Sequence, residues 1–394
     1  MNAPPPAALQ FGAGSVGRGF LAQLFFESGW NTVFVDTDAQ LVENLNSTHS
    51  YQLEIVGPQA RVLNIAGVSA LLPAQHTQIT EVIANAVIAC TAVGAGALQA
   101  IAPVLAEGIL LRMQRQMPPL NILICENLPN AHEILHDAVQ SHLPEHARSS
   151  LGNAAAFVRT AVTRMTPVHT EGMRNLNPSL IRTEAYSMLP VDAEALLQPV
   201  PAMQGMQPAA PFEAYAARKL YAHNGAHAAL GYLGCLHGFT LGWQALENQA
   251  LHRTVEEFLE EAGAALCVEY ALKPADMQEY TRDLLKRFCN RELADTCARL
   301  ARDPLRKLAP NDRLTGALML CRRHGRDTRA IEESIAAAFC CRLPGDEGWE
   351  QLQQIIYSQG LAGALQQICK LPAHEAPGIR ILQAIQRLQA GGGQ

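Results

Sequence analysis

The sequence of 394 residues is poor in aromatic side chains (6%) and in charged side chains (17%), whereas 48% of it is hydrophobic. So high a hydrophobic content excludes a disordered chain. The net charge is −6 and there is no block of Lys or Arg, so nothing favours a nucleic-acid partner. None of the ten cysteines forms a C-x-x-C pair, which argues against a zinc ribbon or a thioredoxin-type site.

The sequence also lacks the marks of a membrane or secreted protein. Met1–Ala8 is Pro-rich and uncharged, without the basic and apolar segments of a signal peptide. The apolar stretch Val82–Leu111 contains Gly94 and Pro103, whereas a spanning helix needs about 20 nearly uninterrupted apolar residues. We therefore expect a cytoplasmic protein without a membrane partner, whose cysteines are reduced thiols.

In the first half, short apolar runs alternate with segments of helical period. Strands are expected at Ala8–Phe11, Thr32–Val35, Val87–Ala92 and Leu120–Cys125, a helix at Val16–Glu27, and a hairpin insertion from Tyr51–Val56 and Arg61–Ile65. This alternation predicts an α/β Rossmann-like domain with a doubly wound, mostly parallel sheet, which we assign to residues 1–190.

From Pro211 onward nearly every segment has helical period. Helices are expected at Phe212–Ala245, His252–Ala271, Pro274–Asn290, Arg329–Phe339, Trp349–Ser358 and Ile379–Leu388. We therefore predict an all-helical C-terminal domain over residues 191–394, in line with a prior of roughly 150 residues per domain.

A glycine-rich turn follows the first expected strand and opens the first expected helix. It consists of Gly12, Ala13, Gly14, Ser15, Val16, Gly17 and Arg18, in a G-x-G-x-x-G arrangement. The first glycine permits the tight turn, the second lets the backbone approach a pyrophosphate, and the third lets the helix pack on the strand. The pyrophosphate would lie at the helix N-terminus, where free N–H groups favour an anion.

An acidic residue ends the next expected strand, at the position where such proteins bind ribose. Asp36 follows the third glycine by about 20 residues, and no Arg next to it could receive a 2′-phosphate. The sequence therefore predicts NAD rather than NADP as the cofactor. Thr91, Ala92 and Val93 end a further strand and are expected along the nicotinamide half of the cofactor, because ligands bind at carboxyl ends of such strands.

The helical half contains Lys219, Asn224 and His227 within one segment. On an ideal helix His227 lies about 80° from Lys219, but Asn224 lies about 140° away. The three side chains therefore converge only if the helix is bent or overhangs a pocket, and Gly225 could supply the bend. His223 and His227 have the i, i+4 spacing of a metal pair, but no further ligand motif completes a site, so we expect no metal.

The spacing K-x-x-x-x-N-x-x-H resembles the shared mark of the long-chain, zinc-independent polyol dehydrogenases. The matching stretches run in order from Leu9 to Phe339 and read LQFGAGSVGRGF, NSTHSYQLEIVG, TAVG, PLNILICENL, ARKLYAHNGAHAALGYLG, DPLRKLAPNDRL and IEESIAAAF. Hydroxyacid dehydrogenases of the 6-phosphogluconate type are a weaker match, because their Lys and Asn are separated by three residues rather than four.

The resemblance implies hydride transfer without zinc at the junction of the two domains. Lys219 would be the general base, and the general acid in the reverse direction. Asn224 and Asn127 would donate to the developing alkoxide, and His227 would orient the substrate or the lysine. A monomer is also implied by the resemblance.

The implied substrate is a sugar or polyol phosphate, with mannitol 1-phosphate and fructose 6-phosphate as the first choice. Arg306 and Lys307 are the expected phosphate ligands, with Arg313 beyond them in the same candidate cluster. Thr163 stands where the family usually has Asp in a V-D-R run. A non-phosphorylated polyol or hexuronate dehydrogenase of the same family therefore remains an alternative, and a non-catalytic NAD-binding regulator is an alternative of another class.

Overall fold

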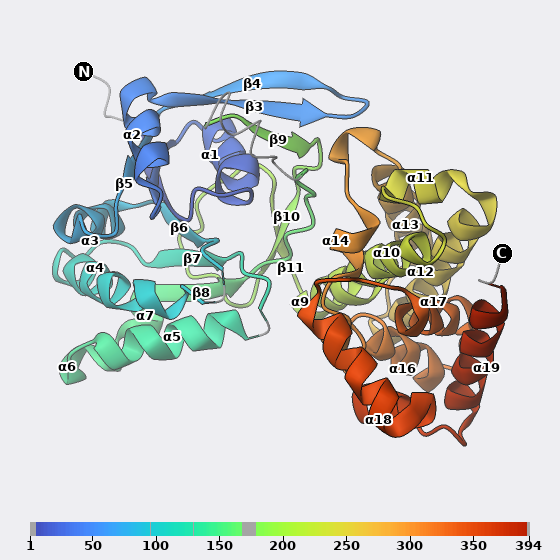
Figure 1. Cartoon of the computed structure of the whole chain (residues 1–394). Helices are drawn as coiled ribbons and strands as arrows, with labels where there is room; N and C mark the ends of the chain where they lie inside the picture. The colour runs from blue at the N-terminus through green and yellow to red at the C-terminus, as the bar shows by residue number, and fades with distance from the viewer. Residues whose placement is uncertain (1–4, 95, 129, 168–178, 392–394) are drawn as a thin grey trace. The chain divides into compact units, whose positions relative to one another are not determined.

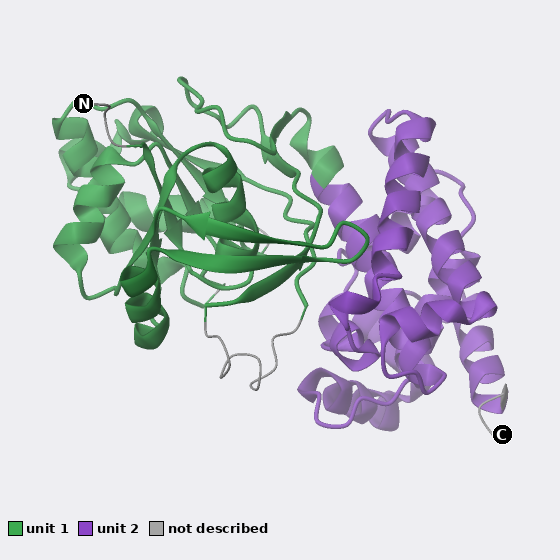
Figure 2. Ribbon diagram, turned by 90° about the horizontal axis from the view of Figure 1, so that it is seen from above, with its two compact units in different colours: residues 1–215 green, residues 216–394 purple. Residues whose placement is uncertain are grey.

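The structure is a computed structural model that describes residues 5–94, 96–128, 130–167 and 179–391. The chain divides into two compact units, unit 1 (residues 1–215) and unit 2 (residues 216–394), which Figure 2 colours separately. The division lies beyond residue 190 because β10 (Leu189–Asp192) pairs with β11 (Met206–Ala209). In addition, Ala161 N donates to Pro190 O at 2.9 Å, which ties this strand pair to unit 1.

Unit 1 is built on a six-stranded parallel sheet, which confirms the predicted α/β architecture (Figure 1). The strands lie in the order β5 (Val68–Leu71), β2 (Asn31–Val35), β1 (Ala7–Phe11), β6 (Ile88–Thr91), β7 (Leu120–Ile124) and β8 (Ala155–Arg159). Side chains alternate between the two faces of a strand, so Leu9 and Phe11 enter one apolar core and Ala8 enters the other. The order reverses between β1 and β6, and such a switch point is where open α/β sheets bind ligands.

Helices connect these strands, and a hairpin is inserted among them. The helices are α1 (Ala22–Glu27), α2 (Ala39–Thr48), α3 (His76–Asn85), α4 (Ala102–Gln114), α5 (Ala131–His142), α6 (Glu145–Arg148) and α7 (Leu151–Ala154), with the short turns η1 (Gly17–Leu21) and η2 (Gln99–Ile101). The predicted hairpin is confirmed: β3 (Ser50–Val56) pairs antiparallel with β4 (Arg61–Ala66), and β9 (Ile181–Glu184) adds to β3 in parallel.

The regular elements in the described part of unit 2 are all helices, as predicted. Its elements are α9 (Phe212–Ala217, which crosses from unit 1), η3 (Arg218–Asn224), α10 (Gly225–Leu236), α11 (Gly242–Glu247), α12 (Gln249–Glu269), α13 (Pro274–Phe288), η4 (Arg291–Leu293), α14 (Cys297–Ala301), α15 (Pro304–Lys307), α16 (Thr315–Arg323), α17 (Arg329–Cys340), α18 (Glu347–Cys369) and α19 (Ala376–Gly391). No helix in the described part of the chain is long and apolar enough to span a membrane. All ten cysteines are free thiols.

The expectation of one helix over Phe212–Ala245 is wrong. Four elements, α9, η3, α10 and α11, occupy this range. The main break follows α10, where Gly238 has φ +78°, a left-handed conformation that ends a helix and that glycine adopts at little cost. Hydrophobic periodicity continues across this break, so it does not reveal the glycine that interrupts the helix.

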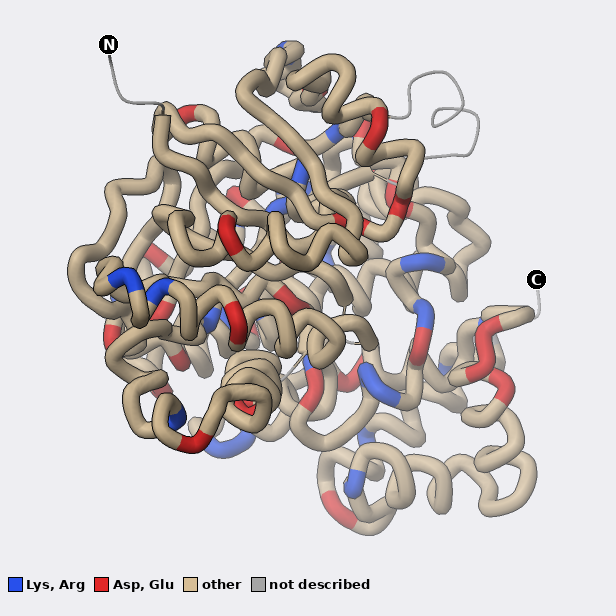
Figure 3. The backbone as a smooth tube through the Cα atoms, turned by 90° about the vertical axis from the view of Figure 1, so that its left-hand side faces the viewer, with Lys and Arg blue, Asp and Glu red and all other residues tan. Residues whose placement is uncertain are grey.

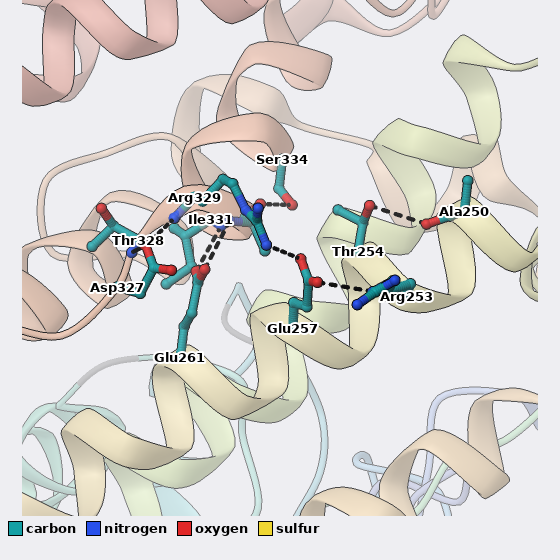
Figure 4. Close-up of polar contacts among 11 residues, drawn as sticks. Ala250, Arg253, Thr254, Glu257, Glu261, Asp327, Thr328, Arg329, Ile331 and Ser334 are labelled. Carbon is teal, nitrogen blue, oxygen red and sulfur yellow. Dashed lines mark hydrogen bonds and ion pairs between the residues drawn. The ribbon is translucent and has the colours of Figure 1, made fainter.

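Glu261 of α12 holds the N-terminus of α17 (Figure 4). Its carboxylate accepts from Ala330 N at 2.9 Å and from Ile331 N at 3.0 Å. Burial raises the pKa of Glu261 to about 7, although the two backbone N–H groups oppose this shift. The glutamate is therefore partly protonated near neutral pH and joins two long helices of unit 2.

Replacing Glu261 with Gln is expected to flatten the dependence of stability on pH. Because its folded pKa of about 7 lies above the ordinary value of 4.5, Glu261 contributes stability below pH 4.5 that is lost as pH rises through 7. This loss amounts to about 3 kcal/mol of unfolding free energy, and the neutral Gln does not undergo it. Denaturant unfolding between pH 4.5 and 8 measures the difference, and parallel curves for the two proteins would contradict it.

Candidate active site

The glycine turn of unit 1 lies at the switch point of the sheet, as its motif predicts. Gly12 has φ +88°, and a Cβ there would lie 2.3 Å from Ala92 O. A Cβ on Gly17 would lie 2.1 Å from Gly12 O, so the third glycine permits close packing of the turn on itself. At Gly14 nothing lies within 4 Å of a Cβ, which leaves the outer side of the turn open to a ligand.

Asp36 lies directly beside this turn. Its Oδ2 accepts from Ala13 N at 2.6 Å, and its Oδ1 accepts from Asp38 N at 3.0 Å. The predicted ribose ligand and the predicted pyrophosphate turn are therefore next to each other in the folded chain. This pairing of a glycine turn with a carboxylate fits a dinucleotide with free ribose hydroxyls.

Arg18 holds the turn from the inside. Its guanidinium is buried and donates to Ala13 O at 2.5 Å and to Ser179 O at 2.6 Å, and Tyr51 Oη donates to Arg18 O at 2.6 Å. Burial lowers the pKa of Arg18. The Arg18 side chain thus binds the protein's own carbonyl groups, whereas the sequence placed it among the cofactor ligands.

A second pair of loops meets at the ends of β6 and β7. Glu126 accepts from Val93 N at 2.8 Å and from Gly94 N at 2.9 Å, so one carboxylate ties the β7 loop to the β6 loop. Thr91 is fully buried, and its Oγ1 has no hydrogen-bond partner among the described residues. Asn127 follows Glu126 and is exposed. The two hydrogen bonds that Glu126 accepts hold the backbone from which the Asn127 side chain projects.

In unit 2 the helix that carries Lys219 and Asn224 is not α-helical. Residues 218–224 form a π-helix, in which each N–H bonds to the carbonyl five residues earlier. Lys219 and Asn224 are five residues apart, so this turn brings them onto one face. The expected bend at Gly225 is wrong: its φ of −64° and ψ of −57° are helical. Such π-turns occur often at functional sites.

His227 follows one α-helical turn later and is held by an aromatic stack. Its ring lies on the Phe288 ring at 4.5 Å with an interplanar angle of 9°, and the His223 ring meets both rings edge-on. Burial, together with Arg287, lowers the pKa of His223 well below 6.5, and the Nδ1 of this buried ring has no hydrogen-bond partner among the described residues. Burial also lowers the pKa of His227, although Asp295 opposes the shift.

A cavity of about 160 Å³ in unit 2 is lined by Asn224 and His227 together with five cationic side chains. The cations are Arg299, Arg302, Arg306, Lys307 and Arg313. Acidic and basic segments are interspersed along the chain (Figure 3), and here too Arg299, Arg306 and Arg313 each pair with a carboxylate, of Asp295, Asp303 and Asp312 in turn. Of the predicted residues, the cavity brings together Asn224, His227, Arg306 and Lys307, and Lys219 lies one π-turn before Asn224.

The cations of this cavity differ in burial and in pairing. Lys307 is 5% exposed, donates to Leu300 O, and has its pKa lowered to about 7 by burial and by Arg313 and Arg306. Arg306 is half-exposed and donates to Asp303 at 2.6 Å, and Arg313 donates to Asp312 at 2.7 Å. The arginines of this cavity suit an anionic group, and their forks match the oxygens of a phosphate, whereas Lys307, with a pKa of about 7, is only partly charged near neutral pH.

Several residues of this arrangement were not predicted from sequence. They are Glu126, Asp295, Arg299 and Arg302. Only Glu126 carried a local signal, since it stands between a strand end and Asn127. Within the described residues, no group of three or more His, Cys, Asp or Glu could hold a metal ion.

Comparison with known proteins identifies the family of the chain over most of its length. Residues 6–205 match the model of the mannitol dehydrogenase Rossmann domain, and residues 212–366 match that of the mannitol dehydrogenase C-terminal domain. The chain belongs to the mannitol dehydrogenase family. The two matched ranges agree with the two units found in the structure.

Individual members of the mannitol dehydrogenase family resemble the chain over nearly its full length. The mannitol-1-phosphate 5-dehydrogenase of Anoxybacillus flavithermus is 33% identical over 370 residues, which are 93% of this chain and 96% of that protein. The enzyme of the same name from Bacillus subtilis is 32% identical over 370 residues, with the same coverage of both chains.

Solved structures confirm the fold. The mannitol 2-dehydrogenase of Pseudomonas fluorescens, solved with NAD and D-mannitol, aligns with a TM-score of 0.73 and 16% identity, and covers 98% of this chain and 92% of that one. A D-sorbitol dehydrogenase without substrate aligns with a TM-score of 0.81 and 17% identity, and covers 98% and 94%. The Rossmann and helical domains of the family are therefore both present here.

Proposed function

We propose that the protein transfers hydride between NAD(H) and a polyol phosphate, interconverting D-mannitol 1-phosphate and D-fructose 6-phosphate. The observation that carries this proposal is the cationic cavity of unit 2. Its wall contains Asn224 and His227 of the family motif and five cations that could bind a phosphate. The relatives at 32–33% identity bear the name of the enzyme that acts on this substrate.

NAD fits the residues at the switch point of unit 1. The open side of Gly14 leaves room for the pyrophosphate, and Asp36 can accept from ribose hydroxyls, whereas its charge would repel a 2′-phosphate. Thr91, Ala92 and Val93 lie on the neighbouring strand end. When bound, NAD+ supplies the acceptor for the hydride. A higher kcat/KM with NADPH than with NADH would contradict the role given to Asp36.

Lys219 acts in this proposal as the general base, without a metal ion. It takes the proton from the secondary alcohol as the carbon loses hydride, and returns it in the reverse direction, for which its amine must be neutral in the reactive form. Asn224 and Asn127 donate amide hydrogens to the alkoxide oxygen, which gains negative charge as the proton leaves. The π-turn supports this pairing, because it puts Lys219 and Asn224 on one face.

The experiment that tests the function is NADH oxidation, followed by absorbance, with three acceptors. Fructose 6-phosphate is expected to react, whereas fructose and a hexuronate are expected to react at least about a hundredfold less efficiently, because they lack the group that the cations bind. Activity with fructose or the hexuronate alone would favour a non-phosphorylated substrate. Activity with none of the three would favour a regulator that binds NAD.

Replacing Arg306 with Ala is expected to raise KM for fructose 6-phosphate about tenfold. A charge-assisted bond to phosphate contributes about 1.5–3 kcal/mol, and the pairing of Arg306 with Asp303 reduces the net loss. KM for fructose should stay unchanged. Arg253, which is 80% exposed on α12, provides a matched control as Arg253→Ala. An unchanged KM in Arg306→Ala would remove this residue from the phosphate site.

We further propose that the enzyme works as a monomer in the cytoplasm. The family resemblance supports the monomer, and the free state of all ten cysteines is consistent with a reducing compartment. Light scattering of the purified protein would give a single-chain mass under this proposal and a multiple of it otherwise.

A further inference from the structure

Asp295 stands between two groups on the wall of the cationic cavity. Its Oδ2 lies 3.6 Å from His227 Nε2, and its Oδ1 accepts from the guanidinium of Arg299. Both of those side chains line the cavity, whereas Asp295 is 8% exposed and lies behind them. One buried carboxylate therefore touches two cavity groups that come from separate elements.

The backbone of Asp295 is held on both sides. Gly242 N donates to Asp295 O at 2.9 Å, and Thr296, the next residue, forms a bridge with Leu241 and caps α14 by accepting from Arg299 N at 3.2 Å. These bonds fix the carboxylate relative to α10, which packs directly on α14. Asp295 thus has the rigid support that a residue needs in order to hold other side chains in place.

The charges around Asp295 favour the ionised form of its carboxylate. Burial by itself would raise the pKa of Asp295, but His227 and Arg299 outweigh burial and hold it below its usual value. The charged or titratable groups that face His227 are His223 from the π-turn, Asp295 just before α14, Arg299 of α14 and Lys307 of α15. Asp295 is the only anion among these four, so its removal leaves His227 facing cations and another imidazole.

We propose that Asp295 is a positioning residue that orients the His227 ring and the Arg299 guanidinium toward the substrate in this cavity. The inference rests on the proposed function, because it assigns the two groups to a phosphorylated substrate. The Phe288 stack limits tilting of the His227 ring, and the carboxylate selects which ring edge turns inward and which faces the cavity. The same carboxylate stops Arg299 from swinging into solvent, since its side chain is 38% exposed.

Asp295→Asn is the direct test, because it keeps the shape of the side chain and removes its charge. We expect kcat/KM for fructose 6-phosphate to fall about a hundredfold, through both a lower kcat and a higher KM. KM for NADH is expected to stay unchanged, since the cofactor residues lie in unit 1. Because Asp295 raises the pKa of His227, the NMR titration of His227 should move to lower pH in the variant.

Glu257→Gln is the matched control. Glu257 also joins two side chains, Arg253 and Arg329, but on the outer surface of α12 and α17 (Figure 4). It should leave the kinetics and the His227 titration as in the wild type. Wild-type kinetics and an unchanged titration in Asp295→Asn would overturn the proposal.

A second variant and a second readout keep the test decisive. If Asp295→Asn does not fold, Asp295→Glu retains the charge but displaces it by one methylene. A lower kcat/KM at an unchanged melting temperature supports positioning, and wild-type kinetics overturns it. If the wild-type enzyme ignores phosphorylated sugars, the proposed function fails. The inference is then judged on the His227 titration and on the affinity for inorganic phosphate, which Asp295→Asn should weaken about tenfold.

Discussion

Lys219→Ala is expected to lower kcat for fructose 6-phosphate reduction by about 10²–10⁴-fold, the usual contribution of a general acid or base. Alanine removes the amine to which the proposed mechanism assigns the proton exchange with the substrate hydroxyl. The π-turn pairs Lys219 with Asn224, so the donor to the alkoxide remains after the substitution. Stopped-flow and steady-state NADH oxidation measure the loss.

The Lys219→Ala experiment needs a readout that separates chemistry from binding. NADH affinity, measured by fluorescence, should stay within about twofold of the wild type because the residues proposed to bind the cofactor lie in unit 1. Lys286→Ala, an exposed lysine of α13, is the control for loss of a positive charge. A Lys219→Ala enzyme that keeps half of its turnover would show that another group moves the proton.

Gly14→Ala is expected to weaken NADH binding by at least about tenfold while the protein keeps its melting temperature. A Cβ at Gly14 would meet nothing within 4 Å, so the fold tolerates it. The same methyl group would project from the turn toward the pyrophosphate, where the second glycine of this motif allows close approach. Fluorescence titration with NADH and thermal unfolding measure the two quantities.

Two other glycines provide the comparison for Gly14. Gly152→Ala in α7 also adds a methyl group with no neighbour within 4 Å, and it should leave both quantities unchanged. Gly12→Ala should lower the melting temperature, since its Cβ would lie 2.3 Å from Ala92 O at a φ of +88°. Normal NADH affinity in Gly14→Ala would contradict the location of the pyrophosphate.

The glycine turn and the Asp36 carboxylate that we propose for the cofactor could be placed from sequence because their signals are local. A glycine turn needs three glycines at fixed spacing, and Asp36 follows the next strand at a fixed distance, so both appear in a short stretch of chain. The parallel sheet then places them together, as the bond from Ala13 N to Asp36 shows. The Arg18 side chain turns inward and donates to Ala13 O. A sequence motif does not reveal the direction in which a side chain points.

The substrate half was only partly predictable because its residues meet through tertiary packing. The α-helical period predicts the wrong angle between Lys219 and Asn224 around the helix axis, because these residues form a π-turn. The residue types in a π-turn do not distinguish it from an α-helical turn. Arg306, Lys307 and Arg313 lie close together in sequence and were found there, whereas Arg299 reaches the same cavity from α14 and was not. Asp295 carries no motif, and only its contacts with His227 and Arg299 reveal it.

The central claim is that the cationic cavity selects a phosphorylated substrate. It is tested most directly by the ratio of kcat/KM for fructose 6-phosphate to that for fructose, measured with NADH and the wild-type enzyme. If the cations bind the phosphate, this ratio is about 10² or more, which corresponds to about 3 kcal/mol of selective binding to the phosphate. A ratio of one or less would contradict it.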